Sequence, residues 1–226
     1  MALTDAHSRS VVDCLTELGS QPDGLSTPEA ARRLVEHGAN RLPEARARGP
    51  VLRLLLQFHN VLIYVLIGAA VVTGALQHWV DTAVILAVVL ANAVIGFIQE
   101  GKAEAAMAAI RTMLAPRAAV LRDGHRVTVD GADLVPGDIV LLEAGDKVPA
   151  DLRVLEARGL AAQEAILTGE SVPVEKAVAS VAADAALGDR RSVLWSGTLV
   201  TQGTARGLVV ATGAETEIGR IGGLLA

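Results

Sequence analysis

A glutamate flanked by a glycine and two hydroxyl residues is the feature of this sequence that most clearly points to chemistry. Thr168, Gly169, Glu170 and Ser171 put a carboxylate beside a residue that lets the backbone approach another group closely. Such a carboxylate can accept a proton or orient a water molecule. Four residues of this kind also make an ordinary turn, so the surrounding elements must show whether the loop does chemistry.

Two other clusters combine proline, glycine and aspartate, at residues 134–138 and 145–151. Proline and glycine beside aspartate form tight turns for conformational reasons, and we interpret both clusters as structural. Ser171 offers a different chemistry, that of a membrane-anchored serine hydrolase. That alternative is disfavoured because the surrounding region supplies only His125 as a base and no nucleophile elbow.

Composition and charge exclude several classes of protein. The 226 residues are 51% hydrophobic but only 2% aromatic, so the apolar residues must lie in aliphatic runs. A net charge of −5 leaves no basic surface of the kind that nucleic-acid binding requires. A single cysteine, Cys14, excludes an internal disulfide framework and is expected to pack a helix. The first forty residues contain no secretory signal, so we expect a cytoplasmic N-terminus.

Two runs without charged residues predict a transmembrane helical hairpin. They cover residues 54–80 and 82–99, and we expect spans at about 56–77 and 81–100, since a bilayer core is about 30 Å thick. Trp79 suits a membrane interface at the turn. Basic residues precede the first run and follow the second, which predicts both ends in the cytoplasm: Arg41, Arg46, Arg48, Arg53, Lys102, Arg111 and Arg117. Two core helices of a larger soluble protein are the alternative.

Polar residues and glycines within the runs suggest contacts rather than an ion pathway. We expect His59 and Asn60 to anchor the hairpin at the interface, and Gly68, Gly74 and Gly96 to lie at helix contacts. The second helix is predicted to continue from residue 81 to 114, about 50 Å, so that part of it forms a cytoplasmic stalk.

The first fifty residues predict a pair of amphipathic helices. The first has an apolar stripe at helical spacing, formed by Val11, Val12, Leu15 and Leu18. The second begins with a capping box of Ser26 and Glu29, followed by Pro28 in the first turn, and can end at Gly38. Its predicted buried face consists of Ala30, Ala31, Leu34 and Val35.

Residues after the stalk change to the alternation of strands. Residues 118–122 and 126–130 predict a hairpin around Asp123 and Gly124. Further strands are predicted at 139–142, 152–157, 193–195, 198–201 and 207–212, with a mobile loop at 177–191. The fold class is therefore membrane α+β: a helical segment (1–50), a hairpin with stalk (51–115), a mainly antiparallel β domain (116–213) and a linker toward a third span (214–226).

In this order, the pieces resemble the N-terminal third of a P-type cation-transporting ATPase of the calcium-pump-like group. The resemblance runs nearly end to end and includes both turn clusters. Its other segments are residues 24–34, 38–40, 95–100, 167–176, 196–198 and 211–219. Two departures are Ala165, where the family commonly has serine, and the unusual residues Val193 to Trp195 ahead of Gly197 and Thr198.

The resemblance implies an actuator domain in which Glu170 is the dephosphorylation residue. Glu170 would polarise the water that attacks an aspartyl phosphate in another domain, Gly169 would allow close approach, and Thr168 and Ser171 would orient the loop. ATP and Mg²⁺ are expected for the full-length pump and no cofactor for this chain. The implied partners are the lipid bilayer, the phosphorylation and nucleotide domains, and a transported cation.

Calcium is the family-level expectation for that cation, with sodium, potassium, magnesium and protons as alternatives. The lack of cysteine motifs argues against the heavy-metal branch. We expect a bacterial plasma membrane. The sequence contains no Asp-Lys-Thr-Gly-Thr motif and ends at Ala226, so the expectation is a chain that cannot hydrolyse ATP alone. A non-catalytic membrane-anchored regulator or a truncated pump remnant is the alternative.

Overall fold

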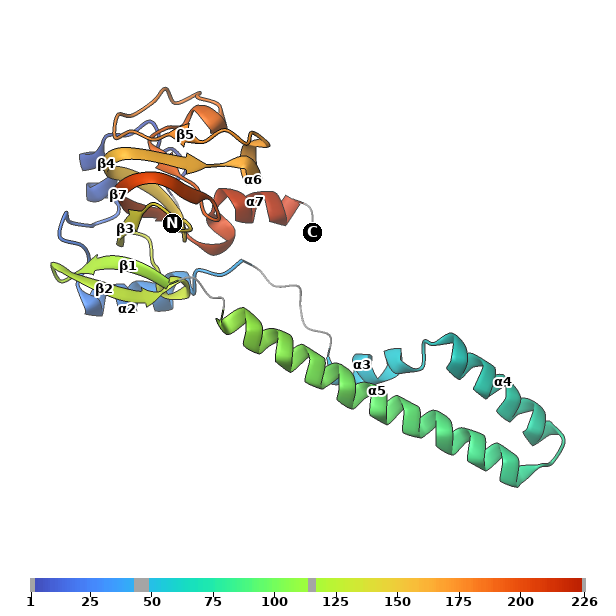
Figure 1. The fold of residues 1–226 in the computed structure, drawn as a ribbon. Coiled ribbons are helices and arrows are strands. Elements are labelled where there is room, and N and C mark those ends of the chain that lie inside the picture. Colours follow the sequence, from blue (N-terminus) through green and yellow to red (C-terminus); the bar gives the residue numbers. More distant parts are fainter. Residues whose placement is uncertain (1–2, 43–48, 114–116, 225–226) are drawn as a thin grey trace. The chain divides into compact units, whose positions relative to one another are not determined.

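The structure of the chain, a computed structural model, describes residues 3–42, 49–113 and 117–224 (Figure 1). The described residues form two compact units. One contains residues 49–113, and the other combines residues 3–42 with residues 117–224.

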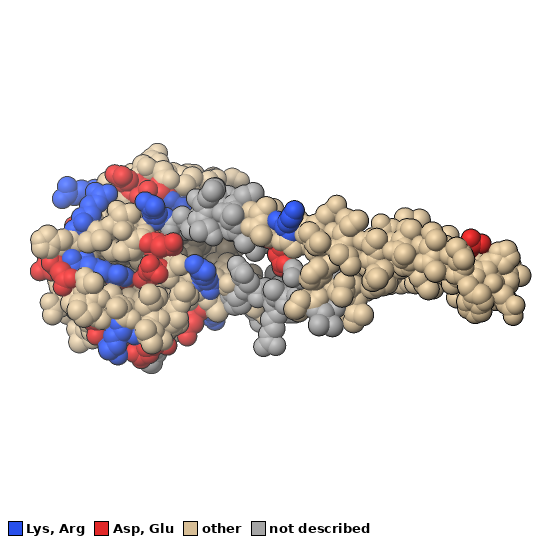
Figure 2. Space-filling view, turned by 90° about the horizontal axis from the view of Figure 1, so that it is seen from below, with Lys and Arg blue, Asp and Glu red and all other residues tan. Residues whose placement is uncertain are grey.

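The first unit is a helical hairpin with a very long second helix. Its helices are α3 (Pro50–Gln57), α4 (Val61–Ala75) and α5 (Trp79–Met113). The 35-residue α5 confirms the prediction of one helix that continues beyond the apolar run. Among the described residues, Trp79–Met107 is the helix long and apolar enough to cross a membrane. Figure 2 shows almost no charged side chains along this unit away from its ends.

The predicted first span, residues 56–77, contains α4, which begins five residues later and ends two residues earlier, and its crossing of a membrane stays a prediction. α3 ends at Gln57, and α4 begins at Val61 with Asn60 as its N-cap residue, whose side chain accepts a hydrogen bond from Leu62 N at 2.9 Å. Asparagine favours such a cap and therefore interrupts the apolar run. The 15 residues of α4 extend for about 22 Å, less than the hydrocarbon core. Interfacial anchoring by His59 and Asn60 stays a prediction.

The glycines of the hairpin differ in what they contact. A side chain at Gly96 would collide with Gln57 Oε1, and the Gln57 amide donates to Glu100 Oε2 at 2.6 Å, so Gly96 lets α3 pack against α5. Gly74 faces Thr82 at the turn between α4 and α5. Among the described residues nothing lies within 4 Å of a Cβ placed on Gly68, so a helix contact there stays a prediction.

The second unit is built on an antiparallel sheet (Figure 1). Its spatial order is β2-β1-β3-β7-β4-β5, with the short β6 paired to β4. The strands are β1 (Arg117–Arg122), β2 (His125–Asp130), β3 (Ile139–Glu143), β4 (Asp151–Gln163), β5 (Val174–Glu175), β6 (Val193–Leu194) and β7 (Leu199–Ala211). Valine, leucine and alanine side chains of the sheet pack together in a hydrophobic core, in which Val120, Leu152 and Val209 are completely buried. The predicted antiparallel β domain is confirmed.

The two longest strands, β4 and β7, are longer than predicted and pair with each other through β-bulges. Residues 198–201 and 207–212, predicted as two strands, belong mainly to the single strand β7, and β4 extends six residues past Ala157. Register shifts between β4 and β7 accommodate Gly203, which has a φ of 78°. A glycine inside a strand often marks such a bulge. Gly203 therefore interrupts the alternation of the sequence without ending the strand. The loop 177–191 contains the 3₁₀ turn η2 (Leu187–Asp189).

The N-terminal helices pack on the sheet along a narrower face than predicted. In α1 (Val11–Glu17), Cys14 is fully buried, as expected, but Val12 is 69% exposed. In α2 (Thr27–His37), Ala30 is buried, whereas Ala31 and Val35 are exposed, so these two predictions and that for Val12 are wrong. The reason is that a polar side chain, Arg33, makes part of the contact between α2 and the rest of the unit.

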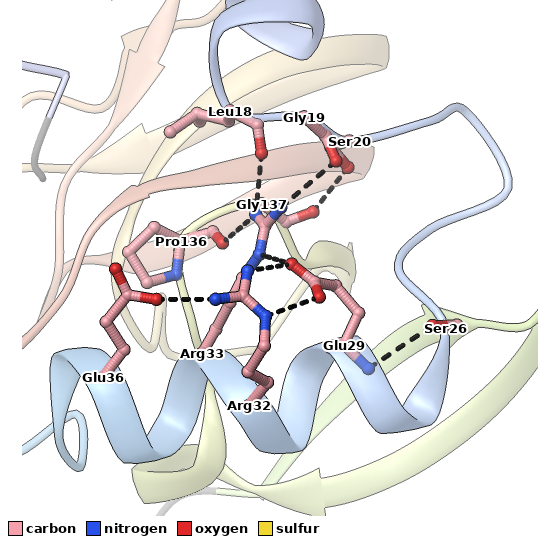
Figure 3. Close-up of polar contacts among 10 residues, drawn as sticks. All are labelled: Leu18, Gly19, Ser20, Ser26, Glu29, Arg32, Arg33, Glu36, Pro136 and Gly137. Atoms are coloured by element: carbon pink, nitrogen blue, oxygen red, sulfur yellow. Dashed lines mark hydrogen bonds and ion pairs between the residues drawn. The ribbon is translucent and has the colours of Figure 1, made fainter.

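Arg33 attaches α2 to the first turn cluster (Figure 3). Its guanidinium donates to the carbonyls of Leu18 at 2.7 Å and Pro136 at 2.9 Å, and to Glu29 Oε1 at 2.7 Å. Gly137 has a φ of 97°, and a Cβ there would collide with Arg33 Nη1. Arg32 and then Arg33 lower the pKa of Glu29 to about 2. Glu29 therefore binds these arginines, while Ser26 alone caps the helix.

Asn40 links the N-terminal segment to three parts of the domain. Its Nδ2 donates to the carbonyls of Gly131 and Pro149, both at 2.9 Å, and its Oδ1 accepts from Gly213 N at 2.7 Å. Gly131 begins η1 (Gly131–Asp133), and Gly213 begins η3 (Gly213–Glu215). One amide therefore ties together segments that resemble the family in sequence but lie far apart along the chain.

Asp151 joins the second turn cluster to the C-terminal helix α7 (Glu217–Leu224). Its buried carboxylate accepts hydrogen bonds from Ser196 N at 2.8 Å and Glu217 N at 2.7 Å. Burial nevertheless raises its pKa from 3.8 to about 6, against the effect of these hydrogen bonds. Asp151 thus stabilises the fold most when it is protonated.

We therefore expect the contribution of Asp151 to stability to fall as pH rises. Because its pKa is higher in the folded state, the extra stability is complete below about pH 4 and is lost as pH passes 6. Relative to Asp151→Asn, which does not titrate, the free energy of unfolding should fall by about 2–3 kcal/mol between pH 4 and 7.5. Urea titrations of the chain in detergent can use the fluorescence of buried Trp195 in a Trp79→Phe background. A pH-independent difference would contradict the expectation.

Candidate functional site

The loop that carries Glu170 lies between β4 and β5 at one side of the sheet. A single helical turn, α6 (Ala165–Thr168), follows β4 directly. Gly169 ends this turn in the left-handed conformation, with φ 77° and ψ −5°. No described residue lies within 4 Å of a Cβ placed on Gly169, so the backbone angle, and not a lack of space, favours glycine here.

The hydroxyl of Thr168 connects the helical turn to Glu170. It donates to Glu164 O at 3.2 Å and accepts from Glu170 N at 3.3 Å. The backbone at Glu170 is therefore held by a side chain two residues earlier. The orienting role that the family resemblance implies for Thr168 stays a prediction.

Glu170 lies on the surface of the loop. Its residue is exposed, and within the described ranges no hydrogen bond or ion pair to its carboxylate is found. Ser171 is also exposed, and its hydroxyl has no hydrogen bond within the same ranges, so its orienting role stays a prediction. Ile166 and Val172, on either side of Glu170, are 62% and 73% exposed. The Glu170 carboxylate is therefore accessible on the surface of the loop.

A buried ion pair closes the base of this loop. Lys176 Nζ lies 2.5 Å from Glu164 Oε1, and the side chains of both residues are completely inaccessible to solvent. Burial raises the pKa of Glu164 and lowers that of Lys176, while each charge opposes the shift of the other. We call Glu164 and Lys176 the loop clamp.

Sequence reasoning assigned no role to the loop clamp, although a signal was present. Glu164 directly follows β4, two residues after buried Ala162, and the alternation of the strand, continued by one residue, directs both toward the same face. An acid at an inward position needs a buried cation, and Lys176 at the far end of the loop is the one that supplies it.

The order of the strands excludes the serine-hydrolase alternative. His125 begins β2 at one edge of the sheet, whereas Ser171 follows β4 at the other side. His125 Nδ1 instead contacts Asp123 O at 2.7 Å. The nucleophile, base and acid of a triad must lie within hydrogen-bond reach, and these residues do not.

The loop offers a carboxylate that can orient water. Glu170 can accept a proton or a hydrogen bond from water. In the parts of the chain that the structure describes, no three His, Cys, Asp or Glu residues form a metal-binding group.

The fold and the exposed Glu170 loop define a class of protein, and comparison with known families agrees. Residues 112–226 match the P-type ATPase actuator domain, and residues 6–73 match the N-terminal region of cation transporters and ATPases. The chain therefore belongs to the P-type ATPase family.

Similar proteins point to the cation-transporting members of that family. The chain is 48% identical to a probable cation-transporting ATPase F of Mycobacterium tuberculosis over 97% of its length, and 44% identical to the cation-transporting ATPase pma1 of Synechocystis over 95%. It is 41% identical to calcium-transporting ATPase 1 of Bacillus cereus over 99%. These matches cover 24%, 24% and 26% of the relatives, so the chain spans about a quarter of their length.

Proposed function

We propose that this chain is the N-terminal part of an ATP-driven cation pump, and that its β domain drives dephosphorylation of an aspartyl-phosphate intermediate. The observation that carries the proposal is the placement of Glu170 on an exposed loop with a fixed backbone, where no described residue binds its carboxylate. A carboxylate placed in this way is available to a reaction centre in another domain.

Glu170 would act on water and not on phosphorus. Its carboxylate would accept a hydrogen bond from a water molecule, increase the negative charge on the water oxygen, and aim that oxygen in line with the leaving aspartate oxygen. Thr168 would hold the backbone of Glu170, and Gly169 would provide the sharp end of the helical turn. Ser171 would complete the orientation of the loop.

Charge repulsion limits when this can happen. A carboxylate is repelled by a phosphoryl group, so the reaction centre needs positive charge from outside this chain. In a complete pump, ATP would supply the phosphoryl group and Mg²⁺ would supply part of that charge. Dephosphorylation would then occur only when the loop reaches the phosphorylated domain.

The hairpin would link this step to transport. α5 continues well past its apolar section, so movement of its charged end can be transmitted into the membrane. We propose a bacterial plasma membrane, with residues 3–42 and the β domain in the cytoplasm. Ca²⁺ is the cation to test first because several relatives are named calcium-transporting ATPases; sodium, potassium, magnesium and protons are the alternatives.

Phosphorylation experiments test the proposal. A complete pump containing this segment should incorporate γ-phosphate from ATP into a hydroxylamine-sensitive acyl phosphate, at a level that depends on the transported cation. Each candidate cation can be titrated in turn. The present chain, purified alone with ATP and Mg²⁺, should show no turnover. Glu170-dependent ATP hydrolysis by the chain alone would contradict the proposal.

A further inference from the structure

The loop clamp encloses a segment with Glu170 at its midpoint. Glu164 and Lys176 each lie six residues from Glu170 along the chain. Their side chains are fully buried and their charged atoms are 2.5 Å apart. The two ends of the segment are thus fixed to each other, while its middle is exposed.

Backbone pairing alone holds the base of the loop weakly. β5 has only two residues, which pair with Ala161 and Ala162 of β4. One more hydrogen bond, from Lys176 N to Leu160 O at 2.9 Å, extends this ladder. So short a ladder opens easily. A contact between side chains at the same place therefore has a large share in keeping the ends together.

A continuous set of contacts leads from the clamp to Glu170. The carbonyl of Glu164 accepts hydrogen bonds from Leu167 N at 2.9 Å and from both the amide and the hydroxyl of Thr168, at 3.0 and 3.2 Å. The same hydroxyl accepts from Glu170 N. Displacement of Glu164 would therefore be passed through Thr168 to the backbone of Glu170.

The energetics of the clamp favour a role in geometry over a role in stability. Removing two charges from water costs about as much as their attraction returns, so a buried ion pair adds little net stability. It does impose one arrangement, because any other leaves a buried charge without a partner. A neutral apolar pair would fill the same space without that requirement.

We propose that Glu164 and Lys176 are positioning residues, which fix the loop so that Glu170 meets the phosphorylated site in one orientation. This inference rests on the proposed function of Glu170. Neither residue touches the reacting atoms, since both side chains are fully buried at the base of the loop. Their effect on dephosphorylation passes through the backbone.

The first test measures the stability of the loop in the present chain. Lys176→Met leaves a buried carboxylate without its cation. The double variant Glu164→Gln/Lys176→Met is therefore made as well, because it removes both charges and preserves folding. Amide hydrogen exchange of Leu167, of Thr168 and of the residue at position 176 should accelerate about tenfold or more in both variants, while β7 amides stay unchanged. The matched control is Glu175→Gln, a charge removal at an exposed neighbouring position. Unchanged loop exchange in the double variant would overturn the inference.

The second test measures the consequence in a complete pump. Both variants should form the phosphoenzyme at the normal rate but lose it about tenfold more slowly, because phosphorylation does not use this loop. A merely structural role would lower formation and decay together, and that result would overturn the inference. The Glu170→Gln variant is measured in parallel. If it decays normally, the proposed function fails, whereas normal decay only in the clamp variants removes the positioning role.

Discussion

Replacing Glu170 with glutamine in a complete pump should leave phosphoenzyme formation intact and slow its decay by about 100-fold or more. Glutamine keeps the size of the side chain, but its amide cannot accept a proton from water as a carboxylate does. Glu170 is exposed and its carboxylate makes no hydrogen bond or ion pair within the described ranges, so the substitution should not disturb folding. The rate is measured by labelling with γ-phosphate, quenching the supply of ATP, and following the remaining acyl phosphate.

Two neighbouring substitutions make this result specific. Glu175→Gln removes an exposed charge a few residues away and should leave the decay unchanged. Thr168→Val removes the hydroxyl that holds Glu170 N and should slow decay by about tenfold, less than loss of the carboxylate itself. A normal phosphoenzyme lifetime in Glu170→Gln would refute the assigned role.

Local sequence patterns predicted most of the β domain. The hairpin at Asp123 and Gly124 was predictable because an Asp-Gly pair favours the two-residue turn that joins twisted strands. The structure shows the positive φ angles that this turn requires, 52° and 74°. The division of β7 into two strands was wrong because Gly203 marks a bulge, and a bulge resembles a strand end in sequence. Whether such a glycine is a bulge or a strand end depends on pairing with a strand distant in the chain, and the local sequence does not show that pairing.

The helical segments show where composition alone is insufficient. Apolar character predicted one span over residues 56–77, but Asn60, four residues after the predicted start, is the N-cap of α4. Val12 and Val35 were predicted to be buried from their spacing, whereas Cys14 and Arg33 make the contacts that hold the helices. Periodicity identifies an apolar stripe without showing how much of it a partner covers.

The candidate site was predictable in its exposed part and not in its support. The residue types of Thr168 to Ser171 suggested the loop, but the clamp depends on two charges twelve positions apart meeting in the core. The turn clusters were correctly interpreted as structural, although their partners were not foreseen. Pro136 binds Arg33, Asp138 binds Arg122, and Asp151 caps α7.

Asp138 is the cluster residue whose removal should destabilise the protein most. It is fully buried and binds the guanidinium of Arg122 through two hydrogen bonds, at 2.9 Å from Nε and 2.7 Å from Nη2. It also accepts from Val135 N at 3.0 Å. Asp138→Ala would leave a buried amide unpaired and a nearly buried cation without its carboxylate, with the Asp133 carbonyl at 3.1 Å as a neutral partner, so the free energy of unfolding should fall by about 3–5 kcal/mol.

A second variant separates the charge from the packing. In Asp138→Ala/Arg122→Met no unpaired charge is left, and the double variant should therefore be more stable than Asp138→Ala alone. The control is Glu156→Ala, which breaks a partly exposed ion pair with Arg206 and should cost less than about 1 kcal/mol. Urea unfolding followed by Trp195 fluorescence in the Trp79→Phe background measures all three. A loss below 1 kcal/mol for Asp138→Ala would contradict the expectation, because it would mean that the neutral Asp133 carbonyl is a sufficient partner for a guanidinium so close to the core.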